Sequence, residues 1–345
     1  MPQPPCPAAA PQLRRLALTL ALALGASGAM GAAGALAQTT PGDAPRLSLP
    51  LECTLDQTCF IQNAFDRDPG PGVRDHGCGA LSYDGHRGTD FALPSLAAMR
   101  AGVDVRAAAP GRVTGTRDGE EDGAFLTGAD LGGRDCGNGV MIDHGNGWRT
   151  QYCHLARGSI TVRPGTTVAR GAVLGRVGLS GRSEFPHVHL SVFHGETRVD
   201  PFAPDAAEAC DPAASGLWDP PLPYRPGGLI AVGITPFMPD YDTVKAGPPA
   251  ATTLPAKAPV LVLWAHAFGA RAGDEIALEL AGPSGVLVRN RESLPRAQAR
   301  FFRAAGKRNP GGVQGWPAGV YSGTVQLLRA GQILERRAIR IRIEG

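Results

Sequence analysis

Two histidines two residues apart share one face of a predicted β-strand near the middle of the chain. The segment 185–192 reads FPHVHLSV, in which apolar residues alternate with polar ones. In an extended chain alternate side chains point the same way, so His187 and His189 project together while Val188 and Leu190 face the core. Packing two imidazoles without polar partners is costly. We therefore interpret this face as a functional site.

A histidine and an aspartate four residues apart, His86 and Asp90, supply a second pair of polar side chains. Two glycines and a proline in the run 85–94 argue against a helix and for extended backbone. Four is an even number, so on a strand these two side chains also share a face. A further histidine, His154, lies in the strand-like run 151–155. Two histidines and one carboxylate, with a fourth position left for water, are typical ligands of a catalytic zinc ion.

The order of these motifs resembles a known family. His-x-x-x-Asp, Tyr-x-His-Leu and Pro-His-x-His follow one another as in the LytM/lysostaphin-type zinc metallopeptidases, which cut peptide bonds in peptidoglycan. The segments 111–113, 139–145 and 173–178 resemble the framework of the same family, and the resemblance covers about residues 70–200. One departure is Phe185, which stands where the family usually has glycine. That position shapes the substrate groove and does not bind the metal.

The resemblance implies a role for each of the five residues. His86, Asp90 and His189 would hold a Zn²⁺ ion, which would activate a water molecule. His154 and His187, which are not ligands in the family, would act as general base, stabilise the tetrahedral intermediate and protonate the leaving amine. Histidine suits this work because its unperturbed pKa of about 6.5 lies near the working pH. The function implied is a secreted zinc metalloendopeptidase whose partner is peptidoglycan and not nucleic acid.

Two other functions are compatible with the sequence. Some relatives of this fold have lost their metal ligands and activate cell-wall amidases, so a catalytically silent wall-binding protein or amidase activator is the main alternative. In a third interpretation the C-terminal region is the functional part and the peptidase is vestigial. The complete ligand set of this chain favours the enzyme. For the remaining histidines we expect packing or surface roles; they are His76, His144, His194 and His266.

The first 37 residues carry the features of a secretory signal peptide. Arg14 and Arg15 precede an apolar run that extends to residue 35, and an Ala-x-Ala site ends at Ala37. A membrane anchor, the alternative, would need a longer run free of glycine and serine. We therefore expect cleavage after Ala37 and a periplasmic or secreted protein. No later segment is apolar enough to span a bilayer.

Cysteine usage agrees with export. Six cysteines follow the predicted signal peptide, and in an oxidising compartment they suggest three disulfides among fifteen possible connectivities. A hairpin at Asn146-Gly147 would bring Cys136 close to Cys153. Cys53 and Cys59 are near in sequence, which leaves Cys78 with Cys210. A structural zinc site is the rival interpretation, but no Cys-x-x-Cys spacing supports it.

The rest of the chain predicts a mostly β protein with two domains. We expect an N-terminal segment (38–70), an antiparallel β-sheet peptidase domain with long loops (71–212), a proline-rich linker (213–258) and a smaller immunoglobulin-like β-sandwich (259–345). The sandwich prediction rests on short strand-like runs at 260–264, 275–280, 323–328 and 338–343. The run 296–308 fits either a helix or an edge strand.

Charge divides the chain at the same place. Residues 251–345 contain 14 basic and 6 acidic residues, a net charge of +8, whereas residues 38–250 have a net charge of −7. A basic excess is usually a solvated face. The sharper hypothesis is that the C-terminal domain contacts anionic envelope polymers, lipid headgroups or a protein partner.

Overall fold

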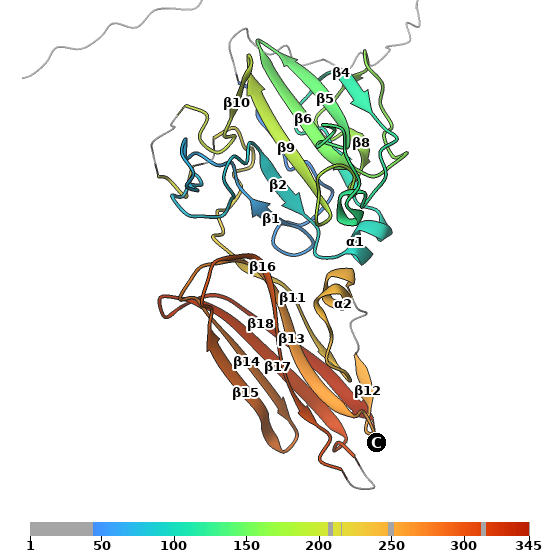
Figure 1. Ribbon diagram of the computed structural model, residues 1–345, viewed down its shortest axis with the longest axis vertical. Coiled ribbons are helices and arrows are strands. Elements are labelled where there is room, and N and C mark those ends of the chain that lie inside the picture. The colour runs from blue at the N-terminus through green and yellow to red at the C-terminus, as the bar shows by residue number, and fades with distance from the viewer. Residues whose placement is uncertain (1–43, 206–209, 215, 248–251, 312–314, 345) are drawn as a thin grey trace, which may run out of the picture. The chain divides into compact units, whose positions relative to one another are not determined.

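Strands dominate the computed structural model, which describes residues 44–205, 210–214, 216–247, 252–311 and 315–344. The predicted signal peptide lies outside the described residues. The region before residue 200 forms an eight-stranded sheet in which all neighbours are antiparallel (Figure 1). The order across this sheet is β1 (Phe60–Asn63), β2 (Thr89–Ala92), β9 (His187–His194), β6 (Trp148–Leu155), β5 (Asn138–Gly145), β4 (Gly111–Arg117) and β7 (Thr167–Val168), with β10 (Thr197–Val199) also paired to β9.

Smaller elements flank this sheet. A two-stranded sheet joins β3 (Asp104–Arg106) to β8 (Val173–Arg176). The short helix α1 (Leu96–Ala101) begins where the Ser95 hydroxyl accepts a hydrogen bond from the backbone N–H of Ala98. A single 3₁₀ turn spans Phe125–Thr127.

Strand β9 is interior to the sheet, and its alternation determines which side chains reach the core. Val188, Leu190 and Val192 are at most 1% exposed and pack in the main hydrophobic cluster of this region. The residues between them, His187 and His189, therefore emerge on the opposite face. The predicted strand and its predicted inward and outward faces are confirmed.

The C-terminal region is a β-sandwich, as predicted. One sheet contains β11 (Gly228–Thr235), β13 (Val260–Ala270) and β16 (Gln298–Arg308). The other contains β12 (Thr253–Pro255), β18 (Gln332–Glu344), β17 (Gly319–Arg329), β14 (Glu275–Gly282) and β15 (Gly285–Ser293). The run 296–308 is thus an edge strand and not a helix. The mostly β fold class is confirmed.

The described residues of the predicted linker 213–258 contain three ordered elements: β11, β12 and the helix α2 (Tyr241–Ala246). Strand β11 pairs with β13 over most of its length and so belongs to the sandwich. Contacts throughout the chain make residues 41–345 one compact unit. The domain boundaries stay a prediction.

All three predicted disulfides are present. They join Cys53 to Cys59, Cys78 to Cys210, and Cys136 to Cys153. The last of these spans the β5–β6 hairpin, whose turn contains Asn146 and Gly147 in the left-handed region of backbone conformation.

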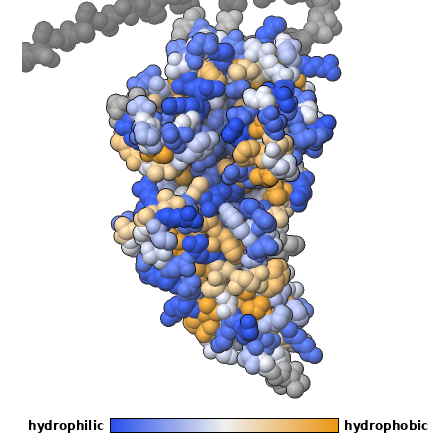
Figure 2. Space-filling view, in the orientation of Figure 1, coloured by the Kyte–Doolittle hydropathy of each residue, from blue (hydrophilic) through white to orange (hydrophobic). Residues whose placement is uncertain are grey.

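In the described ranges, neither helix is long and apolar enough to cross a bilayer. The space-filling view in Figure 2 shows hydrophilic side chains over most of the visible face, with hydrophobic ones in small separate patches.

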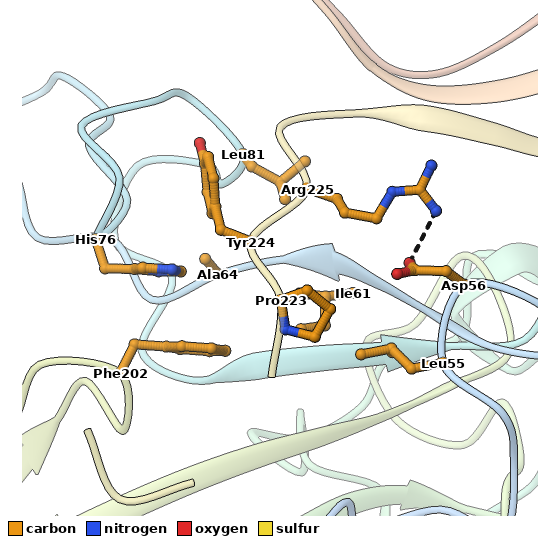
Figure 3. A pocket seen from close by; sticks show the side chains of 10 residues that line it. All are labelled: Leu55, Asp56, Ile61, Ala64, His76, Leu81, Phe202, Pro223, Tyr224 and Arg225. Atoms are coloured by element: carbon orange, nitrogen blue, oxygen red, sulfur yellow. Dashed lines mark ion pairs between the residues drawn. The ribbon is translucent and has the colours of Figure 1, made fainter. Parts of the chain in front are cut away.

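A buried histidine packs away from the predicted site. The rings of His76 and Phe202 are parallel and 4.2 Å apart, with Tyr224 at the edge of His76 (Figure 3). The adjoining cavity has a volume of about 10 Å³, enough for one water molecule and too small for a peptide. Among the described residues, neither ring nitrogen of His76 has a hydrogen-bond partner, and burial lowers the pKa of this side chain to about 4. His76 therefore has the packing role predicted for it.

This lowered pKa predicts an acid-sensitive contribution to stability. Unfolded His76 takes up a proton near pH 6.5, whereas folded His76 does so only near pH 4, so this stabilisation is present above pH 6.5 and is lost as the pH falls toward 4. At pH 4.5 the loss is roughly 2–3 kcal/mol. His76→Phe keeps the stacking and should reduce the drop in Tm between pH 7 and pH 4.5. An equal drop in wild type and variant would contradict the prediction.

Candidate metal centre

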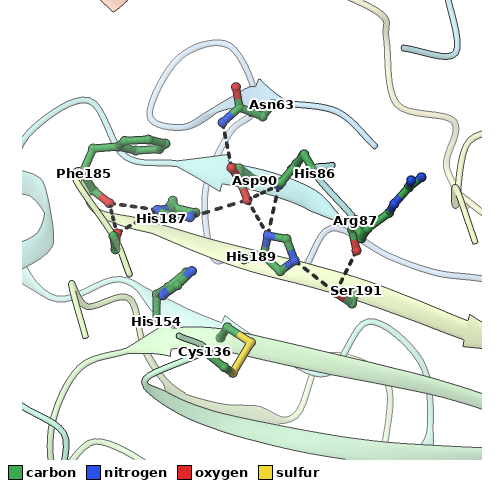
Figure 4. Close-up of polar contacts among 12 residues, drawn as sticks. Asn63, His86, Arg87, Asp90, Cys136, His154, Phe185, His187, His189 and Ser191 are labelled. Atoms are coloured by element: carbon green, nitrogen blue, oxygen red, sulfur yellow. Dashed lines mark hydrogen bonds and ion pairs between the residues drawn. A yellow bond between two sulfur atoms is a disulfide. The ribbon is translucent and has the colours of Figure 1, made fainter. Parts of the chain in front are cut away.

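The structure brings the five predicted site residues together on one face of the sheet (Figure 4). Asp90 is on β2, His154 on β6, and His187 and His189 on β9, while His86 lies in the loop before β2. All five side chains are buried or nearly so. The ring of His154 lies 4.6 Å from that of His187 and 6.1 Å from that of His189, measured between centroids.

Three donor atoms converge at the centre of this group. Asp90 Oδ1 lies 3.1 Å from His86 Nε2 and 2.8 Å from His189 Nδ1, and the two nitrogens are 3.1 Å apart. Ligand atoms held 2.0–2.1 Å from a tetrahedral ion lie roughly 3.3 Å from one another. The spacing of these three atoms therefore fits a zinc ion to within about half an ångström.

For His86 and His189, a hydrogen bond at the ring nitrogen that faces away from the centre (the outer nitrogen) fixes the tautomer. His86 Nδ1 donates to the carbonyl oxygen of Ala64 at 2.7 Å, since a carbonyl can only accept. Ser191 Oγ donates to the carbonyl oxygen of Arg87, so it accepts from His189 Nε2 at 3.0 Å. The inner atoms, His86 Nε2 and His189 Nδ1, are consequently left with lone pairs that face the carboxylate.

The three donor atoms need a proton or a metal ion between them. Burial alone would raise the pKa of Asp90, but His86, His187 and His189 hold the pKa of this carboxyl well below its usual range, so it is ionised. Burial opposes a proton on His86, yet the adjacent Asp90 raises the pKa of that imidazole. Lone pairs of two nitrogens and a carboxylate at such short range repel one another unless a proton or a metal ion lies among them. The donor set fits Zn²⁺ in number and type.

The sheet register positions two of the three donors. Asp90 on β2 is directly opposite His189 on β9, and Cys153 on β6 is opposite His189 on the other side. Gly88 leaves room for the His189 ring beside the backbone that precedes β2. A Cβ atom at position 88 would lie 2.5 Å from His189 Nε2 and 2.7 Å from the carbonyl oxygen of Leu190. Any larger residue at position 88 would displace the imidazole.

His86 reaches the centre by a different route from the one predicted. We expected His86 and Asp90 to share the face of one strand, but β2 begins only at Thr89. His86 instead follows a turn in which its N–H donates to the carbonyl oxygen of Tyr83, with Gly85 in the left-handed region. The turn bends the backbone, so the even spacing of the two residues is not what aligns them.

The two remaining histidines present one free nitrogen each to the centre. His154 Nδ1 donates to the carbonyl oxygen of Ser180, and His187 Nδ1 donates to that of Phe185, both at 2.8 Å. Their Nε2 atoms are therefore unprotonated, and His187 Nε2 lies 3.5 Å from Asp90 Oδ1. Burial lowers the pKa of both side chains, with neighbouring histidines adding to the effect. Two neutral imidazoles can each accept a proton here.

Sequence reasoning missed two residues that support the donors. Asn63 Nδ2 donates to Asp90 Oδ2 at 2.8 Å, and both side chains are buried. Ser191 holds His189 as described above, and its position two residues further along β9 was a usable signal. No signal pointed to Asn63, because it lies 27 residues from its partner on an unpredicted strand.

Comparison with known proteins identifies a family for the central region. Residues 84–201 match the model described as Peptidase family M23. The chain is 36% identical over 107 residues to the peptidoglycan DD-endopeptidase ShyA of Vibrio cholerae, covering 31% of this chain and 20% of that protein. It is 38% identical over 116 residues to the DD-carboxypeptidase/endopeptidase Mpg of Neisseria meningitidis, covering 34% of this chain and 22% of that protein. The chain thus spans about a fifth of the length of these relatives.

Among solved structures, a zinc-containing peptidase from Vibrio cholerae shares 27% identity and covers 40% of this chain and 39% of that one. Its TM-score of 0.27 is too low to support an argument about the fold.

The geometry predicts two classes of variant. Alanine at His86, Asp90 or His189 removes a donor atom and should abolish metal binding at stoichiometric zinc. Alanine at His154 or His187 leaves the three donors in place and should keep the metal, while lowering any turnover by at least about 100-fold if these residues have the general acid–base role predicted for them. Elemental analysis of the purified variants alongside activity measures both effects. Loss of zinc in His154→Ala would show that the donors are wrongly assigned.

Asn63 gives a prediction about the outer hydrogen bonds. Asn63→Leu, of similar volume, removes the N–H that orients Asp90 and should weaken zinc affinity about 10–100-fold. Competition with a chelator measures this affinity. Asn290→Leu, at a partly exposed residue of β15 in the sandwich, is the control and should leave zinc affinity unchanged. An unchanged affinity for Asn63→Leu would mean that the Asp90 hydrogen bond is dispensable.

Proposed function

Because residues 84–201 match the model of Peptidase family M23, as the sequence resemblance predicted, we propose that this protein is a zinc-dependent endopeptidase that hydrolyses peptide bonds in peptidoglycan. The observation that carries the proposal is the convergence of His86 Nε2, Asp90 Oδ1 and His189 Nδ1, all within 4.8 Å of one another. Two neutral histidines beside these atoms complete the chemistry that peptide hydrolysis needs.

In this proposal His86, Asp90 and His189 hold the zinc ion. When bound, zinc supplies a Lewis acid that makes a water molecule a nucleophile near neutral pH and polarises the scissile carbonyl. His154 or His187 accepts the proton of the attacking water at Nε2 and delivers it to the nitrogen of the leaving amine. The carbonyl groups of Ser180 and Phe185 hold the proton on Nδ1 of each ring, which keeps Nε2 available. They also stabilise the imidazolium that forms transiently.

The proposed substrate follows from the named activities of the two relatives, which act on peptidoglycan and as a carboxypeptidase/endopeptidase, respectively. The proposed location is the periplasm or the exterior, where three disulfides persist. The proposed targets are peptide cross-links or stem peptides, on which His154 and His187 would act with the zinc ion bound.

Digestion of purified peptidoglycan tests this function. We expect wild type to release new muropeptides, detected by mass spectrometry, and Asp90→Ala to release none. A zinc chelator should abolish release by wild type, and added zinc should restore it. Full zinc occupancy in wild type without any released product would instead favour the catalytically silent alternative.

A further inference from the structure

Phe185 forms one side of the candidate site. Its ring stacks on the imidazole of His187 with centroids 4.4 Å apart, and its carbonyl oxygen accepts the hydrogen bond from His187 Nδ1 (Figure 4). The aromatic side chain is partly exposed. A substrate that approaches His187 therefore passes beside this ring, which a glycine at the same position would not provide.

A guanidinium from the sandwich lies over the same ring. Arg300, on the edge strand β16, places its Cζ atom 4.7 Å from the centroid of Phe185. Two sets of contacts bring β16 to this point. Gln62 of β1 donates from Nε2 to the carbonyl oxygen of Ala299, the residue before Arg300. Phe185 also packs on a buried cluster drawn from both parts of the chain: Phe60, Leu81, Ala92, Ile230 and Phe268.

Arg300 has no anionic partner in the part of the chain that the structure describes. Its Nε atom is enclosed and makes no hydrogen bond to any described residue, while the residue as a whole is partly exposed. Arg303, three residues along β16, differs in that it pairs with Glu292 and also donates to a backbone carbonyl. Burial lowers the pKa of Arg300 to about 10, so the group is still charged at neutral pH.

A desolvated cation without a counter-charge is unfavourable on its own. The face of Phe185 compensates only in part, since a cation–π contact contributes about 0.5–2 kcal/mol. The guanidinium is a planar fork that matches a carboxylate, and it is less strongly hydrated than an ammonium group. Its position beside the aromatic wall of the site suits recognition of an anion that belongs to the substrate.

We propose that Arg300 and the ring of Phe185 form a subsite for a carboxylate of the substrate peptide, so that the sandwich contributes directly to substrate recognition. This inference rests on the proposed function and extends it. Binding of the carboxylate gives Arg300 the counter-ion it lacks, and it anchors the peptide on the Phe185 side of His187. The carboxylate is either the chain end or an acidic side chain of the peptide.

The test compares steady-state kinetics of wild type and Arg300→Gln on a muropeptide fragment that wild type cleaves. Three forms of the fragment are used: unmodified, amidated at the C-terminal carboxyl, and amidated at the side-chain carboxyl. Arg300→Gln should raise KM for the unmodified fragment about 10-fold or more, with kcat within about twofold, because a charge-assisted hydrogen bond is lost. Arg303→Gln, on the same strand, is the matched control and should leave KM unchanged.

The amidated fragments identify the group that binds. Amidation at the recognised carboxyl should raise KM for wild type and leave Arg300→Gln with little further effect. Amidation at the other carboxyl should leave the full difference in KM between wild type and Arg300→Gln. If Arg300→Gln raised KM by the same factor for all three fragments, or for none of them, the inference would be overturned and Arg300 would have a packing role.

A second variant keeps the inference testable if Arg300→Gln does not fold. Arg300→Lys keeps the charge over the Phe185 ring but loses the planar fork, so it should discriminate less than wild type between the unmodified fragment and the fragment amidated at the recognised carboxyl. Discrimination equal to that of wild type would overturn the inference. Failure of wild type to cleave any fragment would contradict the proposed function itself, which separates the two outcomes.

Discussion

The pairing of β2 with β9 is the constraint on which the candidate centre depends. Their register places Asp90 opposite His189, so a carboxylate oxygen and an imidazole nitrogen meet at 2.8 Å. A slip of one residue would turn His189 toward the core and Val188 toward the site. The apolar residues of β9 are nearly unexposed, so the hydrophobic core opposes such a slip and thereby holds the donors in place.

Around this pair, hydrogen bonds determine which ring nitrogen of each histidine carries the proton. Carbonyl oxygens at Ala64, Ser180 and Phe185 each accept from the outer nitrogen of a histidine, and Ser191 does the same for His189. When neutral, each of the four rings therefore carries its proton on the outer nitrogen and a lone pair on the inner one. Inner nitrogens of His86, His187 and His189 all lie within 3.5 Å of Asp90 Oδ1, an arrangement suited to a cation.

The alternation of polar and apolar residues, together with the order of the motifs, was enough to predict the part of the site that lies on strands. Alternation on β9 placed His187 and His189 on one face, and the motif order added Asp90, His154 and His86. The route of His86 was mispredicted, because a turn closed by Tyr83 replaces strand geometry and even spacing carries no information there. Asn63 and Arg300 could not be inferred, since each acts through a partner far away in sequence. The roles of the five site residues stay a prediction.

The disulfide between Cys136 and Cys153 lies beside His154 (Figure 4), whose own N–H donates to the carbonyl oxygen of Cys136. His154 also has a left-handed backbone conformation, unusual for a residue other than glycine. The cross-link and the hydrogen bond therefore both tie the backbone just before β5 to the end of β6, where His154 holds this conformation.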